Sequence, residues 1–141
     1  MSNLFDVASG EIHIGNHVTL RAGATPQELA LAGLVFVREL NMKTGWIFKV
    51  TNSVVLAGHV VQFSLGFQDD VLKRASFGFT ENPALDMSAL FAEHNVFLRQ
   101  QLGNPNSQND RQSLYQYVWG EIASVWDPRG GGSSICVGWR L

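Results

Sequence analysis

The stretch GHVVQFSLGFQDDVLKRASFGF, residues 58–79, decides the fold class because bulky apolar residues alternate with small or polar ones along it. An alternation with a period of two is typical of β-strands with one buried face, and Gln68-Asp69-Asp70 between the two runs is a turn sequence. Residues 46–51 alternate in the same way. The three segments therefore predict an antiparallel meander, whose bulky positions are Trp46, Phe48, Val50, Val61, Phe63, Leu65, Phe67, Ala75, Phe77 and Phe79.

The residues before this meander predict short strands and a short helix. In residues 11–20 the apolar side chains share one parity, which indicates one strand or two short strands that meet at Gly15-Asn16. Thr25 and Glu28 flank Pro26 in a capping-box pattern, which is typical of the start of a helix. Residues 34–40 fit a helix and a strand equally well.

The residues after the meander predict a second helix and a hairpin. Asp86 suits an N-cap, apolar residues follow at helical spacing, and Gly103 suits the end of the helix. Residues 114–126 and 133–141 predict two strands around a flexible tip at residues 127–132. The predicted order is β-α-β-β-β-α-β-β. This is an α+β fold with a single curved antiparallel β-sheet and two helices, in one domain over residues 1–141.

Charge and composition exclude several classes of partner. The formal net charge is −2, and the basic residues are scattered, with only Lys73 and Arg74 adjacent. Without a basic stripe, nucleic acid is not an expected partner. Cys136 is the only cysteine, so an internal disulfide is impossible, and neither a secretion signal nor a membrane-spanning apolar run is visible. We therefore expect a cytoplasmic protein that does not bind membranes.

Reactive side chains are dispersed, and neither a nucleophile elbow nor a phosphate-binding loop occurs. His13 and His17 would stand about 13 Å apart in a continuous strand, too far for one metal ion unless a turn brings them closer. We expect no catalytic residue, no metal and no cofactor, and hence no enzyme. The alternative is a small-ligand-binding protein or an enzyme with a sheet-lined pocket. The candidate residues for that alternative are His59, His94, Glu121 and Cys136.

Aromatic side chains gather near the C-terminal end. Three of the four tryptophans and both tyrosines lie in the last 27 residues. Large amphipathic rings serve both core packing and protein interfaces, and the sequence leaves both roles open. The parity of the rings changes near Gly120, which indicates a strand buried on both faces or a bulge. The candidate partner-binding residues are Tyr115, Tyr117, Trp119, Trp126, Asp127 and Arg129, of which the two charged ones would set the orientation of the partner.

Small and polar residues occupy the positions opposite the bulky ones on three predicted strands. Such a face cannot form a thick apolar core, and it admits the close approach of a helix or a partner. We hypothesise that this mildly basic face is a docking surface, a hypothesis that fails if the protein's own helices cover it fully. Its residues are Gln62, Ser64, Gly66, Arg74, Ser76, Gly78, Cys136, Gly138 and Arg140.

The segment YVWGEIASVWDPRGGGSSI, residues 117–135, resembles the ending of small, uncharacterised bacterial proteins. The short capped helix followed by a Gly-Trp strand is similar to them in outline. In size and style, such small proteins resemble the immunity proteins that accompany toxins. The resemblance implies a non-catalytic protein that binds and neutralises a toxin domain, its protein partner, and it carries over no catalytic residue. Immunity proteins commonly bind through charge complementarity, whereas the charge of this chain is nearly balanced. A homodimer formed through an exposed edge strand is a further possibility.

Overall fold

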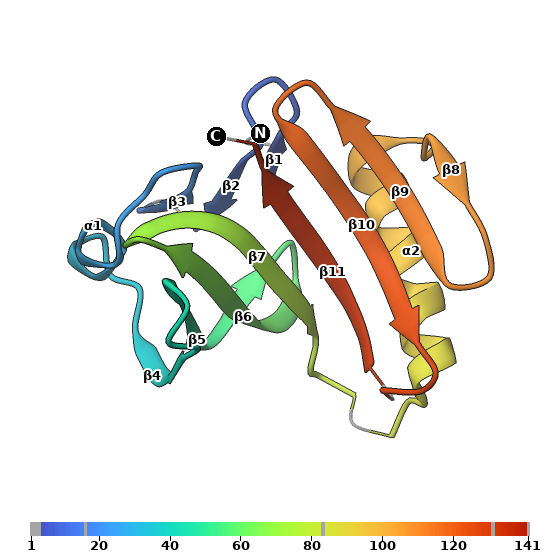
Figure 1. Ribbon diagram of the computed structural model, residues 1–141. Helices are drawn as coiled ribbons and strands as arrows, with labels where there is room; N and C mark the ends of the chain where they lie inside the picture. Colours follow the sequence, from blue (N-terminus) through green and yellow to red (C-terminus); the bar gives the residue numbers. More distant parts are fainter. Residues whose placement is uncertain (1–3, 16, 83, 131, 141) are drawn as a thin grey trace.

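Eleven strands and two helices make up the part of the chain that the structure, a computed structural model, describes: residues 4–15, 17–82, 84–130 and 132–140 (Figure 1). The strands are β1 (Phe5–Asp6), β2 (Glu11–Ile14), β3 (Val18–Leu20), β4 (Phe36–Asn41), β5 (Trp46–Leu56), β6 (His59–Gln68), β7 (Val71–Phe79), β8 (Ser107–Gln108), β9 (Gln112–Tyr117), β10 (Gly120–Asp127) and β11 (Gly132–Trp139). The helices are α1 (Pro26–Leu31) and α2 (Met87–Leu102). Asn16, Gly131 and Leu141, which belong to a predicted turn, tip and strand, lie outside the described residues.

The larger sheet has eight antiparallel strands in the order β4-β5-β6-β7-β11-β10-β9-β8. The hairpin predicted over residues 58–79 is confirmed, since β6 pairs with β7 and Phe63 stands opposite Phe77. The strand β11 lies between β7 and β10, where it joins the two halves of the sheet (Figure 1). The strand β4 forms one edge and has mostly exposed side chains. A homodimer formed through this edge stays a prediction.

The prediction of a single sheet is wrong, because the strands before α1 form a sheet of their own. This smaller sheet has the order β1-β2-β3. Residues 11–20, for which the sequence left one strand or two short strands open, form the two short strands β2 and β3, which pair with Ile12 opposite Leu20. With only two to four residues each, these strands bury their apolar side chains against the core instead of extending an edge of the larger sheet.

The predicted element order is also wrong at residues 114–126, which form two strands instead of one. The strand β9 ends at Tyr117 and β10 begins at Gly120, and these two residues pair across a tight turn at Val118 and Trp119. The change of parity near Gly120 therefore marks a reversal of the chain and not a bulge. The ambiguous residues 34–40 contribute the strand β4.

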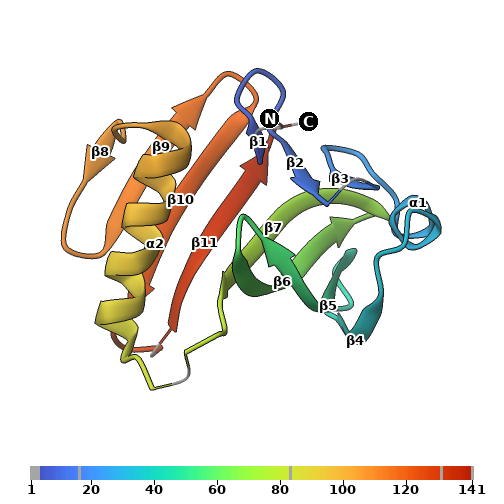
Figure 2. The same ribbon diagram turned by 180° about the vertical axis from the view of Figure 1, so that it is seen from behind.

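Both predicted helices are confirmed, together with their N-caps. Thr25 Oγ1 accepts a hydrogen bond from Glu28 N at 3.2 Å, and Asp86 Oδ1 accepts one from Ala89 N at 2.8 Å. The helix α2 lies behind β9–β11 in Figure 1 and in front of them in Figure 2, so it covers one face of this half of the sheet. Neither helix of the described residues is long and apolar enough to cross a membrane.

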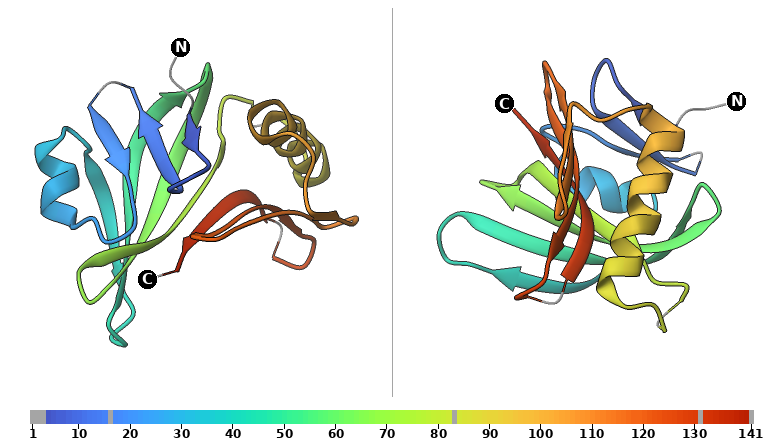
Figure 3. Two further views of the ribbon diagram at one scale, coloured as in Figure 1. Left: turned by 90° about the horizontal axis from the view of Figure 1, so that it is seen from above. Right: turned by 90° about the vertical axis from the view of Figure 1, so that its right-hand side faces the viewer.

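The core lies between one face of the larger sheet and a layer made of α2 and the smaller sheet. Figure 3 shows the larger sheet strongly bent, with α2 packed over its β9–β11 half. All three parts supply buried apolar side chains to one cluster. Its members include Phe63, Phe67, Phe77, Ile122, Ile135 and Val137 from the larger sheet, Leu90, Phe97 and Leu98 from α2, and Phe5, Ile12 and Leu20 from the smaller sheet.

Trp139 of β11 and Trp119 of the turn between β9 and β10 fasten the turn between β1 and β2 to the larger sheet. Trp139 Nε1 donates a hydrogen bond to Gly10 O, and Trp119 Nε1 donates one to Val7 O, each at 2.8 Å. Gly10 allows the Trp119 ring to lie against this turn, because a Cβ at position 10 would stand 2.5 Å from Trp119 Cε3. Its φ of +81° also favours glycine. These aromatic side chains therefore hold the two sheets together.

Candidate functional site

Tyr115, the first of the candidate partner-binding residues, belongs to the core. Its side chain is buried, and its hydroxyl donates a hydrogen bond to Gly103 O at 2.8 Å, just beyond the end of α2. Burial raises the pKa of this hydroxyl, so it stays protonated and keeps donating. Tyr115 therefore connects β9 to α2 and does not reach the surface.

Tyr117, Val118 and Trp119 form a corner at the turn between β9 and β10. The rings of Tyr117 and Trp119 stack with centroids 5.1 Å apart at an interplanar angle of 7°, and Val118 between them is 96% exposed. The corner borders a hollow of about 620 Å³ that Arg140 also lines. A stacked aromatic pair beside an exposed valine gives this corner the composition of a protein interface.

Trp126, Asp127 and Arg129 lie at the opposite end of β10, at the tip of the last hairpin. Trp126 is half-buried and packs against Phe91 of α2 with ring centroids 6.2 Å apart. Asp127 and Arg129 are exposed, and Asp127 Oδ1 accepts a hydrogen bond from Arg129 N at 3.0 Å. By strand rise, β10 separates this tip from the corner by about 23 Å. The structure therefore divides the five predicted binding residues other than Tyr115 between two places.

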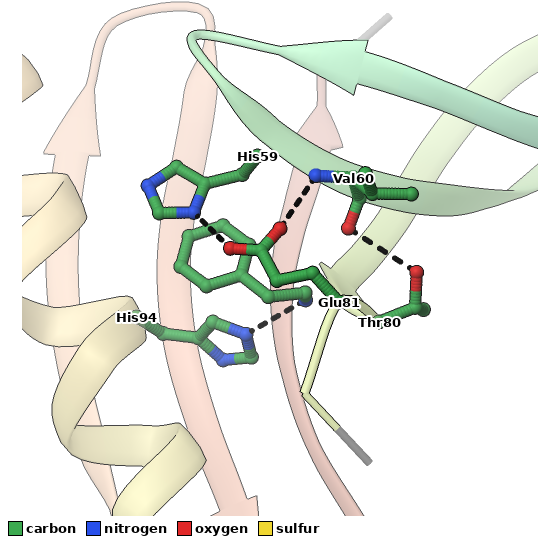
Figure 4. Close-up of polar contacts among 6 residues, drawn as sticks. His59, Val60, Thr80, Glu81 and His94 are labelled. Carbon is green, nitrogen blue, oxygen red and sulfur yellow. Dashed lines mark hydrogen bonds and ion pairs between the residues drawn. The ribbon is translucent and has the colours of Figure 1, made fainter.

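His59, a candidate for the ligand-binding alternative, lies at the surface beside α2 (Figure 4). Its Nδ1 stands 2.7 Å from Glu81 Oε1, and Glu81 Oε2 accepts a hydrogen bond from Val60 N at 2.6 Å. Desolvation raises the pKa of Glu81, but the hydrogen bonds from His59 and Val60 lower it by more. The His59 ring stacks on Phe79 with centroids 4.0 Å apart. These contacts tie β6 to the end of β7.

His94, the second candidate, is a buried structural residue. Its Nε2 accepts a hydrogen bond from Phe79 N at 3.2 Å, and its ring meets the Phe79 ring edge-on at 4.7 Å (Figure 4). Burial, with a smaller effect of nearby His59, lowers the pKa of His94 to about 4, so the imidazole is neutral at pH 7. A neutral imidazole that accepts a backbone hydrogen bond holds α2 against β7.

Glu121 and Cys136, the remaining candidates for that alternative, lie on the other face of the larger sheet. Both line a hollow on the side away from α2, and Cys136 Sγ stands 3.5 Å from Ser134 Oγ. The four polar candidates are thus split between two faces and do not converge on one pocket. In the described part of the chain, no group of three or more His, Cys, Asp or Glu residues could hold a metal ion.

The face of the larger sheet that points away from α2 is called the open face. Trp126 and Tyr115 contact α2 or its end, so their neighbours in β10 and β9 point the other way. The strands β7, β10 and β11 carry on the open face a hollow of about 600 Å³ floored by small side chains. The docking hypothesis would fail if the protein's own helices covered this face fully. The described helices do not cover it, so docking stays a prediction.

The nine residues of the predicted docking face are not equally accessible. Gly66 is covered by the rings of Phe48 and Trp46, and a Cβ at Gly78 would stand 3.5 Å from His94 Cε1. The other seven do not face α2. Gln62, Arg74 and Arg140 are exposed, and Ser64, Ser76, Cys136 and Gly138 are half-buried.

Trp46 is a surface residue of the open face that sequence reasoning did not single out. The alternation in β5 placed Trp46 and Phe48 on one face but could not say which face. Phe48 pairs with Gly66, so its ring lies on the small-residue side. The Arg74 guanidinium stands 5.2 Å from the centre of the Trp46 ring. The signal was the pairing of bulky residues in β5 with small ones in β6, which only the register reveals.

Comparison with known proteins supports one likeness. No family model matches the chain, and no curated protein matches it. A chain of a solved structure, described as Rhs1-CT in complex with cognate immunity protein RhsI1, matches with a TM-score of 0.61 and 14% sequence identity. The match covers 96% of this chain and 86% of that one. At this identity the likeness concerns the fold, and this chain therefore shares the overall fold of a chain from a complex that contains an immunity protein.

Proposed function

We propose that this chain is a non-catalytic, cytoplasmic protein of the bacterial immunity type, which binds a toxin domain and neutralises it. The observation that carries the proposal is the likeness to a chain of the complex of Rhs1-CT with its immunity protein, which extends over 96% of the present chain. Residues 117–135 resemble the ending of small bacterial proteins that are similar to immunity proteins in size and style, which points the same way.

The separation of the reactive side chains supports a binding role over a catalytic one. General acid–base or nucleophilic catalysis needs its groups within hydrogen-bond reach of one another. His94 instead accepts a backbone hydrogen bond in the interior, and Cys136 lies on the opposite face. The neutral state of His94 at pH 7 serves packing of α2 against β7.

The partner-binding residues that we propose are Tyr117 and Trp119 at the corner and Trp126, Asp127 and Arg129 at the hairpin tip. Rigid aromatic rings supply contact area at low cost in conformational entropy. The stack of Tyr117 on Trp119 and the hydrogen bond from Trp119 to Val7 O hold the corner in one conformation. Tyr115 contributes indirectly, because it holds β9 against the end of α2.

Co-expression tests the proposal directly. The candidate toxin is the product of the gene immediately upstream of the gene for this chain, expressed from an inducible promoter with or without the chain. We expect the chain alone to leave growth unchanged, the toxin domain alone to arrest growth, and the pair to grow and to co-purify as a complex. Growth arrest that the chain does not relieve, or arrest caused by the chain itself, contradicts the proposal.

Val118 offers a variant that probes the corner without disturbing the fold. Its side chain is 96% exposed, so Val118→Glu places a charge at the corner without burying it. The matched control is Leu31→Glu on α1, where the side chain is 89% exposed. We expect Val118→Glu to lose co-purification and Leu31→Glu to keep it. Equal binding by both variants removes the corner from the interface.

A further inference from the structure

The open face carries a concentration of positive charge that the chain as a whole lacks. Two adjoining hollows of about 600 and 280 Å³, which share Ser64 and Ser76, are lined by four basic residues and one acidic residue. The whole chain has ten basic and twelve acidic residues, so the remaining surface has an acidic excess. Such a segregation of charge orients the encounter with an oppositely charged partner. The charged residues of the open face are Arg38, Lys73, Arg74, Arg140 and Glu121.

The arginines of this face are not neutralised by the residues that the structure describes. Arg38, Arg74 and Arg140 take part in none of the three ion pairs found there, which involve other residues. Arg74 instead lies over the Trp46 ring, a cation–π contact that positions the guanidinium without occupying its donors with a carboxylate. A guanidinium in this state can bind a carboxylate through two parallel hydrogen bonds.

A rigid aromatic wall stands beside these cations. Trp46 and Phe48 stack with ring centroids 5.8 Å apart at an interplanar angle of 11°, and both rings are half-buried. Gly66 lets the stack rest on the sheet, because a Cβ there would stand 2.8 Å from Phe48 Cε1. Tryptophan and arginine are the residue types that most often dominate the energy of protein interfaces. The wall and Arg74 therefore have the composition of an interface hot spot.

We propose that the open face binds an acidic segment of the protein partner, with partner carboxylates seated between Arg74 and Arg140. This inference rests on the proposed immunity function and specifies the chemistry of the partner surface. Arg140 also lines the hollow at the corner of Tyr117 and Trp119, so one partner can contact the corner and the open face together. A protein is favoured over nucleic acid because the chain is acidic overall, which repels a long polyanion.

Charge reversal on the open face tests the proposal with the toxin domain of the co-expression experiment as the probe. We expect Arg74→Glu and Arg140→Glu each to raise the Kd for the toxin domain, measured by calorimetry, by about 100-fold. The matched control is Arg99→Glu, which makes the same change of charge on α2, on the other side of the sheet, and should stay within about twofold. The Kd of the wild type should rise as the salt concentration is raised. The Kd of the two open-face variants should depend less on salt.

A milder variant separates binding from folding. Arg74→Gln removes the cation without introducing repulsion, and it should raise the Kd by about tenfold. Thermal unfolding followed by circular dichroism should be the same as for the wild type. If the open-face variants bind like the wild type while Val118→Glu does not, the open face is not the interface and the immunity function stands. If the wild type does not bind the toxin domain at all, both proposals fail. Binding of a DNA or RNA duplex to the open face, abolished by Arg74→Glu, overturns the assignment to an acidic protein segment.

Discussion

Mild acid should destabilise the fold through His94. The buried imidazole accepts a hydrogen bond from Phe79 N in its neutral form, and burial lowers its pKa from an ordinary 6.5 to about 4. In the unfolded chain the imidazole takes up a proton as the pH falls through 6.5, whereas in the folded protein it does so only near pH 4. The unfolded state therefore binds more protons throughout this window, and the free energy of unfolding falls as the pH falls.

The size of the effect follows from the shift in pKa. The full shift corresponds to a loss of about 3 kcal/mol, of which about 2 kcal/mol is lost between pH 7 and pH 5. Urea unfolding followed by tryptophan fluorescence measures this loss in the wild type and in His94→Gln, whose amide oxygen can accept the same hydrogen bond without titrating. We expect His94→Gln to lose less than about 0.5 kcal/mol over the same range.

An exposed histidine supplies the control. His17 is exposed, and His17→Gln should keep the pH dependence of the wild type. The carboxyl groups of Glu81 and Asp86 also have lowered pKa values, so their protonation lowers the free energy of unfolding as the pH falls. This loss occurs mainly below pH 5 and is the same in every variant. If the wild type and His94→Gln lose the same stability between pH 7 and pH 5, the explanation through His94 is wrong.

Three further substitutions test contacts that hold the elements together. Gly10→Ala should lower the free energy of unfolding in urea by about 2 kcal/mol or more, because of the positive φ and the Trp119 ring. Gly23 has the same φ, but no atom lies within 4 Å of a Cβ added there. An equal loss of stability in Gly23→Ala would show that the clash with the Trp119 ring does not contribute. Trp139→Phe removes the N–H donor to Gly10 O and should cost about 1 kcal/mol by the same assay, so unchanged stability would speak against this hydrogen bond. Asp86→Ala removes the N-cap of α2 and should lower the melting temperature by about 4 °C, whereas Asp86→Asn should melt like the wild type; equal melting of the two variants would exclude the cap.

The elements predicted correctly are those whose signals lie in consecutive residues. The alternation around Phe63 and Phe77 needs no knowledge of the rest of the chain, because a strand with one buried face shows its period locally. The same holds for Asp86, whose side chain caps a backbone N–H three residues ahead. Local signals of this kind predicted β6, β7 and both helices.

The features that sequence reasoning missed depend on contacts between distant residues. Whether the first strands join the larger sheet or form their own is decided by packing, and no residue between 4 and 20 carries that information. Tyr115 and Trp119 have similar chemistry, yet one lies in the core and the other anchors the β1–β2 turn, 112 residues away in the sequence. Trp46 reaches the open face through the pairing of β5 with β6. Aromatic composition alone could not separate these roles.

Because β11 lies at the centre of the larger sheet, the two halves of this sheet can join only after β11 has been synthesised. The strands β4–β7 leave the ribosome as a meander whose β7 edge has no neighbour, and β8–β10 follow as a second group. Only β11, pairing with β7 on one side and β10 on the other, unites them, and Trp139 at its end donates a hydrogen bond to Gly10 O. Until β11 has been synthesised, the β7 edge is open to mispairing with other chains, so the larger sheet is protected from such mispairing only once β11 has joined it.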